Sequence, residues 1–578
     1  MIPPFSPHDG WPAGPRRLVL LGPPGCGKTY AILETFILPA LRGGVSSREV
    51  LAVSFTKAAA TEIASRLARE LGGEVEEYKR TSSTIHSEAY RLVRQFRDPN
   101  VRDEEPRDKI QPDELDEDGA PPERSKGIRR AMRAAWDYAR NTMARGQTRG
   151  DQIAAVWDRF AGEIAFRDVE LDQVIADCES YEASKEERGE IDFTDMLLLA
   201  LERGEVPARE LLVVDEAQDC SPLQWALIEA WSRAARRVLL VGDPDQAVHN
   251  WAGSDVRPLI ARLGDPRWGA RRLAQSYRVP RVAHRLARAL ILRDQDRVDA
   301  PYEPTPRDGQ ALELEPDGAV EAIEEASRAG RKVLVLARSK KLLARLGDAL
   351  IERGTPYRAE RGYSPLTAPI AVSVTRALLA LRLEGRARIR DARLLLRELP
   401  AAGHFPSKRK GKVMSEVVEW PEDAFLEVPT LEAMGVDVRD LLEGSVAAGL
   451  GVLLSPGTAR KKKGKPTPSR DRGREIARIV ENRGLGALDD ELVVTLTSMH
   501  ASKGREAELV VVDLEVPKPV ALTIREGDES DERRLLYVAL TRTQDVLVLV
   551  RPSEARMDMG HLLGLATTSP GGLGTSTA

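Results

Sequence analysis

The sequence predicts an α/β fold in which parallel sheets carry helices on both faces. Short apolar strands alternate with amphipathic helical segments near the start of the chain, and similar strands recur further along it. This alternation is typical of parallel sheets, and the number of strands fits two such sheets. Helical segments that lie between the strands predict mainly helical insertions into the sheet domains.

The first expected strand covers residues 17–22 and ends in glycine, and a helix over 29–42 follows it. A second strand at 50–56 precedes an amphipathic helix over 57–72, which a glycine closes. The remaining apolar runs predict strands at 211–216, 237–243, 331–338, 509–515 and 545–551.

Segments of another kind separate these strands. Residues 99–126 are charged, rich in proline and poor in apolar side chains, which predicts an exposed or mobile loop. Residues 127–204 have helical patterns and predict an insertion into the first sheet domain. Helical patches broken by proline and glycine occupy 375–450, and the basic run at 459–475 is expected to be a loop or linker.

Composition narrows the functional classes. The 578 residues allow about three or four domains, and the net charge of −4 gives no sign of a globally basic surface. The three cysteines lack CxxC spacing, which argues against a disulfide framework and a zinc site. Neither a signal-peptide pattern nor an apolar run of about 20 residues is present, so we expect a cytoplasmic protein that does not bind membranes.

A phosphate-binding loop follows the first expected strand, where the residues match G-x-x-x-x-G-K-S/T. The nucleotide-binding candidates in it are Gly22, Pro23, Pro24, Gly25, Cys26, Gly27, Lys28 and Thr29. Glycines let backbone N–H groups surround phosphates, Lys28 reaches the terminal phosphate oxygens, and the Thr29 hydroxyl suits Mg²⁺. The strand before the loop and the helix after it support a nucleoside triphosphate site.

A carboxylate pair ends the apolar strand at 211–216. Asp215 is the second candidate ligand for Mg²⁺, and Glu216 is the candidate base that deprotonates the attacking water. Because a carboxylate that activates water is present, the pair favours hydrolysis over transfer to a second substrate.

Further strings in the sequence resemble the motifs of the UvrD/Rep group of superfamily 1 DNA helicases. The resemblance is carried by VSFTKAAATEI (53–63), STIHSEAY (83–90), IDFTDMLLLA (191–200), VVDEAQDCSPLQ (213–224), LLVGDPDQAVHNWAGSD (239–255), LAQSYRVP (273–280), TLTSMHASKGREAELVVV (495–512) and DERRLLYVALTRTQDVLVLV (531–550). Their order and rough spacing hold from residue 17 to residue 550.

The resemblance implies two RecA-like P-loop domains with ATP and Mg²⁺ bound in the cleft between them. It assigns catalytic roles to Gln246, Arg278 and Arg542 beside Lys28 and Glu216. It also implies that Tyr277 stacks on the adenine and that Glu506 binds the ribose hydroxyls.

The same resemblance implies contacts with single-stranded DNA and with single-strand/duplex junctions. The matching residues are Phe55, Thr56, Thr84, His86, Trp251 and His500. Aromatic faces suit this role because bases stack on them. Two alternatives stay open, since Trp251 also suits a buried core and His86 a structural position. The basic run at 460–474 suits either duplex phosphates or a solvated linker.

The motif positions predict the domain boundaries. The first RecA-like domain is expected at 1–86 and 191–270, interrupted by a helical insertion at 87–190. The remaining boundaries are 271–370 and 485–555 for the second RecA-like domain, 371–484 for a reduced insertion with the basic linker, and 556–578 for a C-terminal tail.

The resulting functional hypothesis is an ATP-dependent DNA helicase or translocase that moves 3′→5′ on single-stranded DNA and unwinds duplexes. The alternative is a DNA-binding ATPase that remodels protein–DNA complexes or depends on a protein loading partner. The sequence departs from the family pattern in two places. No glutamine precedes the P-loop, so other nucleoside triphosphates remain candidate substrates, and His249 stands where the family has tyrosine.

Cys26 lies inside the phosphate loop close to Lys28. A neighbouring cation and backbone N–H groups lower a thiol pKa. We therefore expect Cys26 either to be a reactive thiol that nucleotide protects or to be an unreactive small loop residue.

Overall fold

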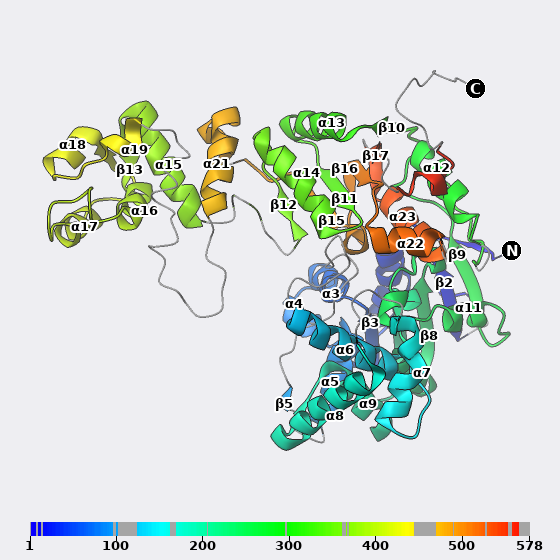
Figure 1. The fold of residues 1–578 in the computed structure, drawn as a ribbon. Helices are drawn as coiled ribbons and strands as arrows, with labels where there is room; N and C mark the ends of the chain where they lie inside the picture. Colours follow the sequence, from blue (N-terminus) through cyan, green and yellow to red (C-terminus); the bar gives the residue numbers. More distant parts are fainter. Residues whose placement is uncertain are drawn as a thin grey trace. The chain divides into compact units, whose positions relative to one another are not determined.

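The computed structural model describes residues 2–565 except 7–9, 13–15, 96–99, 102–123, 162–168, 205, 295–296, 361–363, 365, 367–368, 444–469, 489, 526–528 and 553–557. Figure 1 shows the helices and strands of the fold. Contacts within the chain divide it into two compact units. Unit 1 comprises Met1–Glu313, Arg338–Lys340 and Ser502–Ala578. Unit 2 comprises Leu314–Ala337 and Lys341–Ala501.

A seven-stranded sheet forms the centre of unit 1, with the order β1-β9-β2-β8-β7-β3-β4. Its strands are β1 (Pro4–Phe5), β2 (Arg17–Leu21), β3 (Val50–Ser54), β4 (Ser82–Thr84), β7 (Arg209–Val214), β8 (Ala235–Gly242) and β9 (Gly269–Leu273). All of its pairings are parallel, so the carboxyl ends of β2, β8 and β7 meet at one edge. Loops that follow these three strands are therefore neighbours.

Alternating side chains of this sheet enter two separate hydrophobic cores. Leu18 and Leu20 of β2 lie in one core, whereas Val19 and Leu21 lie in the other. The first core includes Ile63 from α3, and the second includes side chains from α5, α9 and α10. Because successive strand residues point to opposite faces, these apolar runs require a helical layer on each side.

The helices of unit 1 around this sheet follow the expected pattern. Their bounds are α1 (Lys28–Ala31), α2 (Leu38–Arg42), α3 (Lys57–Leu71), α4 (Val75–Tyr78), α5 (Ile85–Arg94), α9 (Phe193–Arg203), α10 (Pro222–Ala234), α11 (Arg257–Leu263) and α12 (Arg281–Ile291). The helix expected over 29–42 is present, but its middle, η1 (Ile32–Ile37), has π-helical geometry. Side-chain caps begin α3 at Thr56, α5 at Thr84 and α10 at Ser221.

Three helices form the insertion in unit 1, namely α6 (Arg124–Asn141), α7 (Arg149–Ala161) and α8 (Leu171–Arg188). They share a small core that includes Trp136, Ile153 and Val174. Two short parallel strands, β5 (Asn100–Val101) and β6 (Glu190–Ile191), lie beside them in the sequence.

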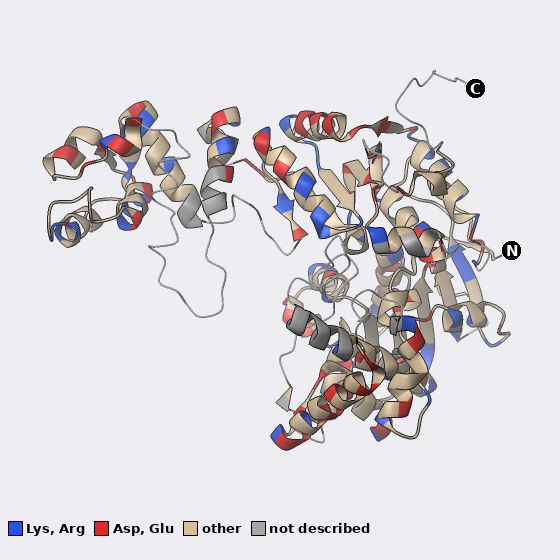
Figure 2. Cartoon of the chain, viewed as in Figure 1, with Lys and Arg blue, Asp and Glu red and all other residues tan. Residues whose placement is uncertain are grey.

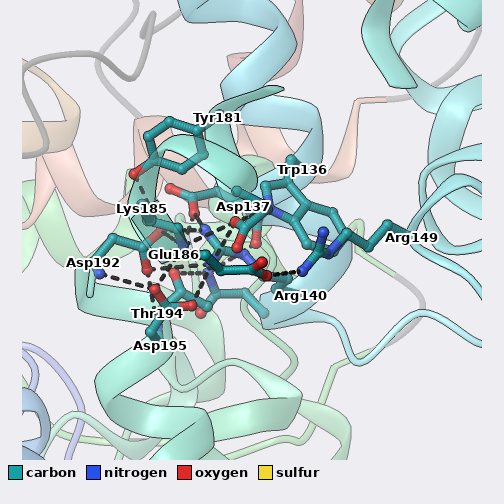
Figure 3. Close-up of polar contacts among 12 residues, drawn as sticks. Trp136, Asp137, Arg140, Arg149, Tyr181, Lys185, Glu186, Asp192, Thr194 and Asp195 are labelled. Atoms are coloured by element: carbon teal, nitrogen blue, oxygen red, sulfur yellow. Dashed lines mark hydrogen bonds and ion pairs between the residues drawn. The ribbon is translucent and has the colours of Figure 1, made fainter. Parts of the chain in front are cut away.

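A buried cluster of charges joins this insertion to α9 (Figure 3). Arg140 of α6 donates to Asp192 at 2.9 Å and to Asp195 at 2.9 Å, and Lys185 of α8 contacts the same two carboxylates at 2.9 and 2.6 Å. Burial opposes ionisation of Asp192, but Arg140 and Lys185 outweigh it and hold its pKa well below its usual range. The carboxylates of Glu182, Asp192 and Asp195 lie close enough together to resemble a metal site, yet these two cations already neutralise them.

A second sheet has six strands in the order β10-β17-β16-β11-β15-β12. Their bounds are β10 (Gln310–Leu314), β11 (Val333–Ala337), β12 (Arg358–Ala359), β15 (Val494–Ser498), β16 (Ala507–Asp513) and β17 (Thr543–Val550). β16 pairs with β17, and β15 pairs with β11 and β12, all in parallel. Two parallel α/β sheets with helices confirm the predicted fold class.

Helices and a small hairpin complete both units. They are α13 (Pro316–Arg328), α14 (Lys340–Glu352), α15 (Pro369–Glu384), α16 (Ile389–Glu398), α17 (Lys410–Val418), α18 (Val428–Ala433), α19 (Arg439–Glu443), α21 (Arg470–Arg483), α22 (Lys518–Arg525) and α23 (Ser530–Leu540). The hairpin pairs β13 (Arg386–Arg388) with β14 (Phe425–Glu427) in antiparallel fashion. Residues 374–441, together with Ala477 of α21, build a separate core around α15 and α16.

Every strand expected from an apolar run is present, with its ends shifted by a few residues. Most of the proposed loop at 99–126, and the basic residues 459–469, lie outside the described residues. Basic and acidic side chains are interspersed over the helices of each unit, as the small net charge implies (Figure 2).

Candidate nucleotide and DNA site

The phosphate loop connects β2 to α1 and is shaped by glycines. Gly25 and Gly27 have φ angles of 70° and 75°, in the left-handed region that favours glycine. A Cβ atom on Gly25 would lie 2.5 Å from Cβ of Arg278, and one on Gly22 would lie 2.2 Å from Cγ of Lys28. The loop therefore has room for its own backbone N–H groups, but it has no room for a side chain at Gly22 or Gly25.

Lys28 and Glu216 form an ion pair at the carboxyl edge of the sheet. Nζ of Lys28 lies 2.9 Å from Oε1 of Glu216. Glu216 follows β7 with a φ of 53°, which is uncommon for a residue with a side chain. Its backbone N–H donates to Oδ1 of Asp215 at 2.9 Å, so the two carboxylates predicted from sequence are held in one turn.

The electrostatics of the two carboxylates differ. Burial and the neighbouring Glu216 raise the pKa of Asp215 to about 7. Burial also opposes ionisation of Glu216, but Lys28 and Lys503 outweigh it and hold the pKa of Glu216 well below its usual range. Glu216 therefore loses its proton at lower pH than Asp215 does.

Gln246 and Arg542 meet beside this turn. Gln246 lies in η7 (Pro244–Gln246) after β8, and its Nε2 donates to Oδ2 of Asp243 at 2.6 Å. Nη2 of Arg542 donates to Oε1 of Gln246 at 3.2 Å, and the arginine is only 2% exposed. Burial lowers the pKa of Arg542 to about 9. These two predicted residues are in direct contact although 296 positions separate them.

The segment 276–278 packs on the phosphate loop. Oγ of Ser276 donates to the Pro24 carbonyl at 2.8 Å, and the backbone N–H of Tyr277 donates to the Gly25 carbonyl at 2.9 Å. Nε of Arg278 lies 2.5 Å from Oε2 of Glu506. The ring of Tyr277 is 68% exposed, so its face is open to a ligand.

Motif reasoning missed Lys503, which has three acceptors in this site. Its Nζ lies 3.2 Å from Oε2 of Glu216 and donates to the Gln246 carbonyl at 3.2 Å and to Asp219. Burial opposes the charge, but Asp219 and Glu216 outweigh it and raise the pKa of Lys503. The sequence signal was its place in the string TLTSMHASKGREAELVVV (495–512), one of those that carry the family resemblance.

Three aromatic side chains lie in a row near these turns. Phe55 follows β3 and stacks on His249 with ring centroids 5.2 Å apart. Trp251, in η8 (Asn250–Ala252), meets His249 edge-on at 6.3 Å. Burial lowers the pKa of His249, so its ring is neutral at pH 7. Trp251 is partly exposed rather than enclosed in a core.

The other DNA candidates have local structural roles. Thr56 and Thr84 accept hydrogen bonds as helix caps, from Ala59 N at 3.2 Å and from Ser87 N at 3.1 Å. His86 lies edge-on to Phe193 at 6.0 Å. His500 begins η12 (His500–Ser502) and belongs to unit 2, unlike the other candidates.

Burial argues against the reactive-thiol alternative for Cys26. The residue is 2% exposed, and burial raises the pKa of its thiol far above the ordinary value despite the nearby Lys28. Its Sγ faces the Pro24 carbonyl at 3.9 Å. The burial of Cys26 therefore favours the alternative interpretation, in which it is a small, unreactive loop residue.

Comparisons with known proteins agree with this geometry. Residues 13–263 match the UvrD/REP helicase N-terminal domain, and residues 460–554 match the UvrD-like helicase C-terminal domain. ATP-dependent DNA helicase UvrD2 of Mycobacterium tuberculosis (strain ATCC 25618 / H37Rv) is 27% identical, covering 93% of this chain and 76% of the relative.

Two further relatives support the same assignment. DNA helicase II of Escherichia coli (strain K12) is 25% identical, covering 61% of this chain and 50% of its own length. The putative ATP-dependent DNA helicase YjcD of Bacillus subtilis (strain 168) is 23% identical, covering 93% of this chain and 77% of its own length.

No helix within the described part of the chain combines the length and the apolar character that a bilayer crossing requires. The matched domains cover the residues that build the phosphate loop, the carboxylate turn and the Arg542 contact. The chain therefore belongs to the UvrD/REP family of superfamily 1 DNA helicases.

Proposed function

We propose that this protein hydrolyses ATP at the site around Lys28 and Glu216, and that hydrolysis moves the chain 3′→5′ along single-stranded DNA and unwinds duplexes. The observation that carries the proposal is the convergence of Lys28, Glu216, Gln246 and Arg542 at one edge of the seven-stranded sheet. These residues supply the donors and the base that water attack on a phosphoryl group requires.

The residues present fit a nucleotide with its metal. The glycines leave a cradle that side chains would fill. Within the described part of the chain, Glu216 is the one carboxylate that forms an ion pair with Lys28. Thr29 and Asp215 offer the hydroxyl and carboxylate oxygens that Mg²⁺ prefers. When bound, MgATP supplies the phosphoanhydride whose hydrolysis releases free energy.

Each side chain then has a distinct task. Lys28 leaves Glu216 to neutralise phosphate oxygens, and Glu216 accepts the proton of the attacking water. Gln246 orients that water, while Arg278 and Arg542 offset the charge that develops on the transferred group. Such arginines contribute on the order of 10³–10⁵ in rate. We assign Tyr277 to the adenine face and Glu506 to the ribose hydroxyls.

The aromatic row is the proposed platform for single-stranded DNA. Stacking of a base on Trp251 or on the Phe55–His249 pair suits a sequence-independent grip. Thr56, Thr84 and His86 are the proposed contacts to the DNA backbone. His500, which follows β15, is a further proposed DNA contact. Junctions between single strands and duplexes are the proposed substrates.

The deciding experiment measures ATP hydrolysis with and without single-stranded DNA. We expect strong stimulation by DNA in the native chain and no hydrolysis in Lys28→Ala, with the exposed Lys518→Ala as a control that keeps activity. Fork substrates with a 3′ or a 5′ tail then test polarity. Hydrolysis without unwinding of either fork would favour a remodelling ATPase that depends on a protein partner, and hydrolysis indifferent to DNA would overturn the proposal.

A further inference from the structure

Lys503 is a buried cation in the nucleotide site to which the proposed reaction assigns no task. Its side chain is 13% exposed, and it lies just before β16, far in sequence from its acceptors. Those acceptors are Glu216 and Asp219 in the turn after β7, and the Gln246 carbonyl in the turn after β8. One ammonium group therefore connects the turns of two neighbouring strands.

The Glu216 carboxylate is held at both of its oxygens. Lys28 contacts Oε1 at 2.9 Å, whereas Lys503 contacts Oε2 at 3.2 Å and Nε2 of Gln218 donates to Oε2 at 2.5 Å. Donors on both oxygens fix the plane of a carboxylate as well as its position. When Lys28 turns to phosphate oxygens, Oε1 becomes free to accept a proton, and Oε2 keeps its donors.

Asp219, the second carboxylate that Lys503 contacts, is also held in place by its neighbours. Asp219 is 2% exposed and lies in η6 (Ala217–Asp219), the short helix that directly follows Glu216. Nε2 of Gln218 contacts Asp219 at 3.3 Å, and Oε1 of Gln218 accepts from Asp243 N at 3.0 Å. Since these partners are buried and mutually bonded, Lys503 has little freedom to leave Glu216.

We propose that Lys503 is a positioning residue for hydrolysis: it holds Oε2 of Glu216 so that Oε1 stays aimed at the attacking water after Lys28 has moved to the phosphates. The proposal rests on the proposed function of the site and deepens it. Lys503 itself touches no reacting atom, so its effect passes through Glu216.

Steady-state hydrolysis in saturating single-stranded DNA tests this role. We expect Lys503→Met to lower kcat about 10- to 100-fold, because a misplacement of about 1 Å costs that much. KM for ATP and the affinity for DNA should stay unchanged, and Lys503→Arg should recover part of kcat. The exposed Lys518→Met is the matched control and should behave as the native chain does.

Loss of Lys503 also leaves Asp219 buried without its cation, so a structural effect must be separated from positioning. The double variant Lys503→Met/Asp219→Asn removes that uncompensated charge, and we expect it to recover thermal stability but not kcat. In a Glu216→Gln background, Lys503→Met should add no further loss, because the carboxylate that it positions is already absent.

Three results would overturn the inference. They are a native kcat in Lys503→Met, recovery of kcat by Asp219→Asn, and a raised KM at native kcat, which would place Lys503 on the nucleotide instead. Failure of the proposed function gives another result: the native chain itself would then show no DNA-stimulated hydrolysis.

Discussion

Gly25 illustrates how a single residue without a side chain determines the shape of the site. It combines a left-handed backbone with close contact to Arg278, whose Cβ and backbone N would lie 2.5 and 3.2 Å from an added Cβ. Neither neighbour can give way easily, because Ser276 and Tyr277 are bonded to the same loop. The residue thus couples the phosphate loop to the arginine proposed to act on the phosphates.

We predict that Gly25→Ala lowers kcat for ATP hydrolysis by at least about 10-fold, because Arg278 must shift to admit the methyl group. Left-handed strain alone costs roughly 1–2 kcal/mol. Gly189→Ala is the matched control, since Gly189 has a φ of 62° and nothing within 4 Å of the added atom. Steady-state kinetics and thermal melting of both variants check this, and equal kcat values in the two would contradict it.

At the scale of elements, the helical insertion depends on its buried charges. Arg140 and Lys185 face the carboxylates of Asp137, Glu182, Asp192 and Asp195, which come from α6, α8 and the start of α9 (Figure 3). Removing one cation leaves buried carboxylates without compensation, which is costlier than losing an exposed pair.

We predict that Arg140→Met lowers the free energy of unfolding of the insertion by about 3–5 kcal/mol. The neighbouring Arg149–Glu186 pair in Figure 3 gives the control, because its side chains are 41% and 70% exposed. Arg149→Met should cost no more than about 1 kcal/mol. Urea unfolding followed by hydrogen exchange in α6 and α8 compares the two, and a similar loss in both variants would rule out a stabilising role for the cluster.

Elements with a strong apolar run were predictable from sequence, whereas polar ones were not. Strand β7 contains the buried apolar run at 211–214, but β4 (Ser82–Thr84) is short and β9 (Gly269–Leu273) contains two arginines. Their strand geometry comes from parallel neighbours on the sheet. Local patterns do not record such pairing.

The residues of the candidate site show the same contrast between positions that a local pattern predicts and positions that depend on distant partners. Lys28, Glu216 and Gln246 follow strands directly, so a motif locates them, and the structure places them within one set of contacts. The roles of Lys503 and Arg140 were not predicted from sequence. Asp219 lies 284 residues from Lys503, and Asp192 lies 52 residues from Arg140, so no local pattern connects them. The reactivity of Cys26 stayed open at the sequence level, because the sequence shows the nearby lysine but not the burial of the thiol.

At the scale of the whole molecule, the proposed nucleotide site lies in unit 1, and the small core at 374–441 lies in unit 2. Every contact described for the phosphate loop, the carboxylate turn, Lys503 and Arg542 lies within unit 1. The core around α15 and α16 contains residues of unit 2 alone. A ligand that binds only the native form of one part stabilises that part by mass action.

We therefore predict that a non-hydrolysable MgATP analogue slows amide hydrogen exchange in β2, α1 and β7 but leaves α16 and α17 unchanged. At about 100 times the dissociation constant, the ligand adds about 2.7 kcal/mol to opening reactions that destroy its site. Exchange measured by mass spectrometry with the analogue, in the native chain and in Lys28→Ala, checks this expectation. Equal protection in α16 and α17 would mean that the small core opens together with the nucleotide site, and protection that persists in Lys28→Ala would place the ligand elsewhere.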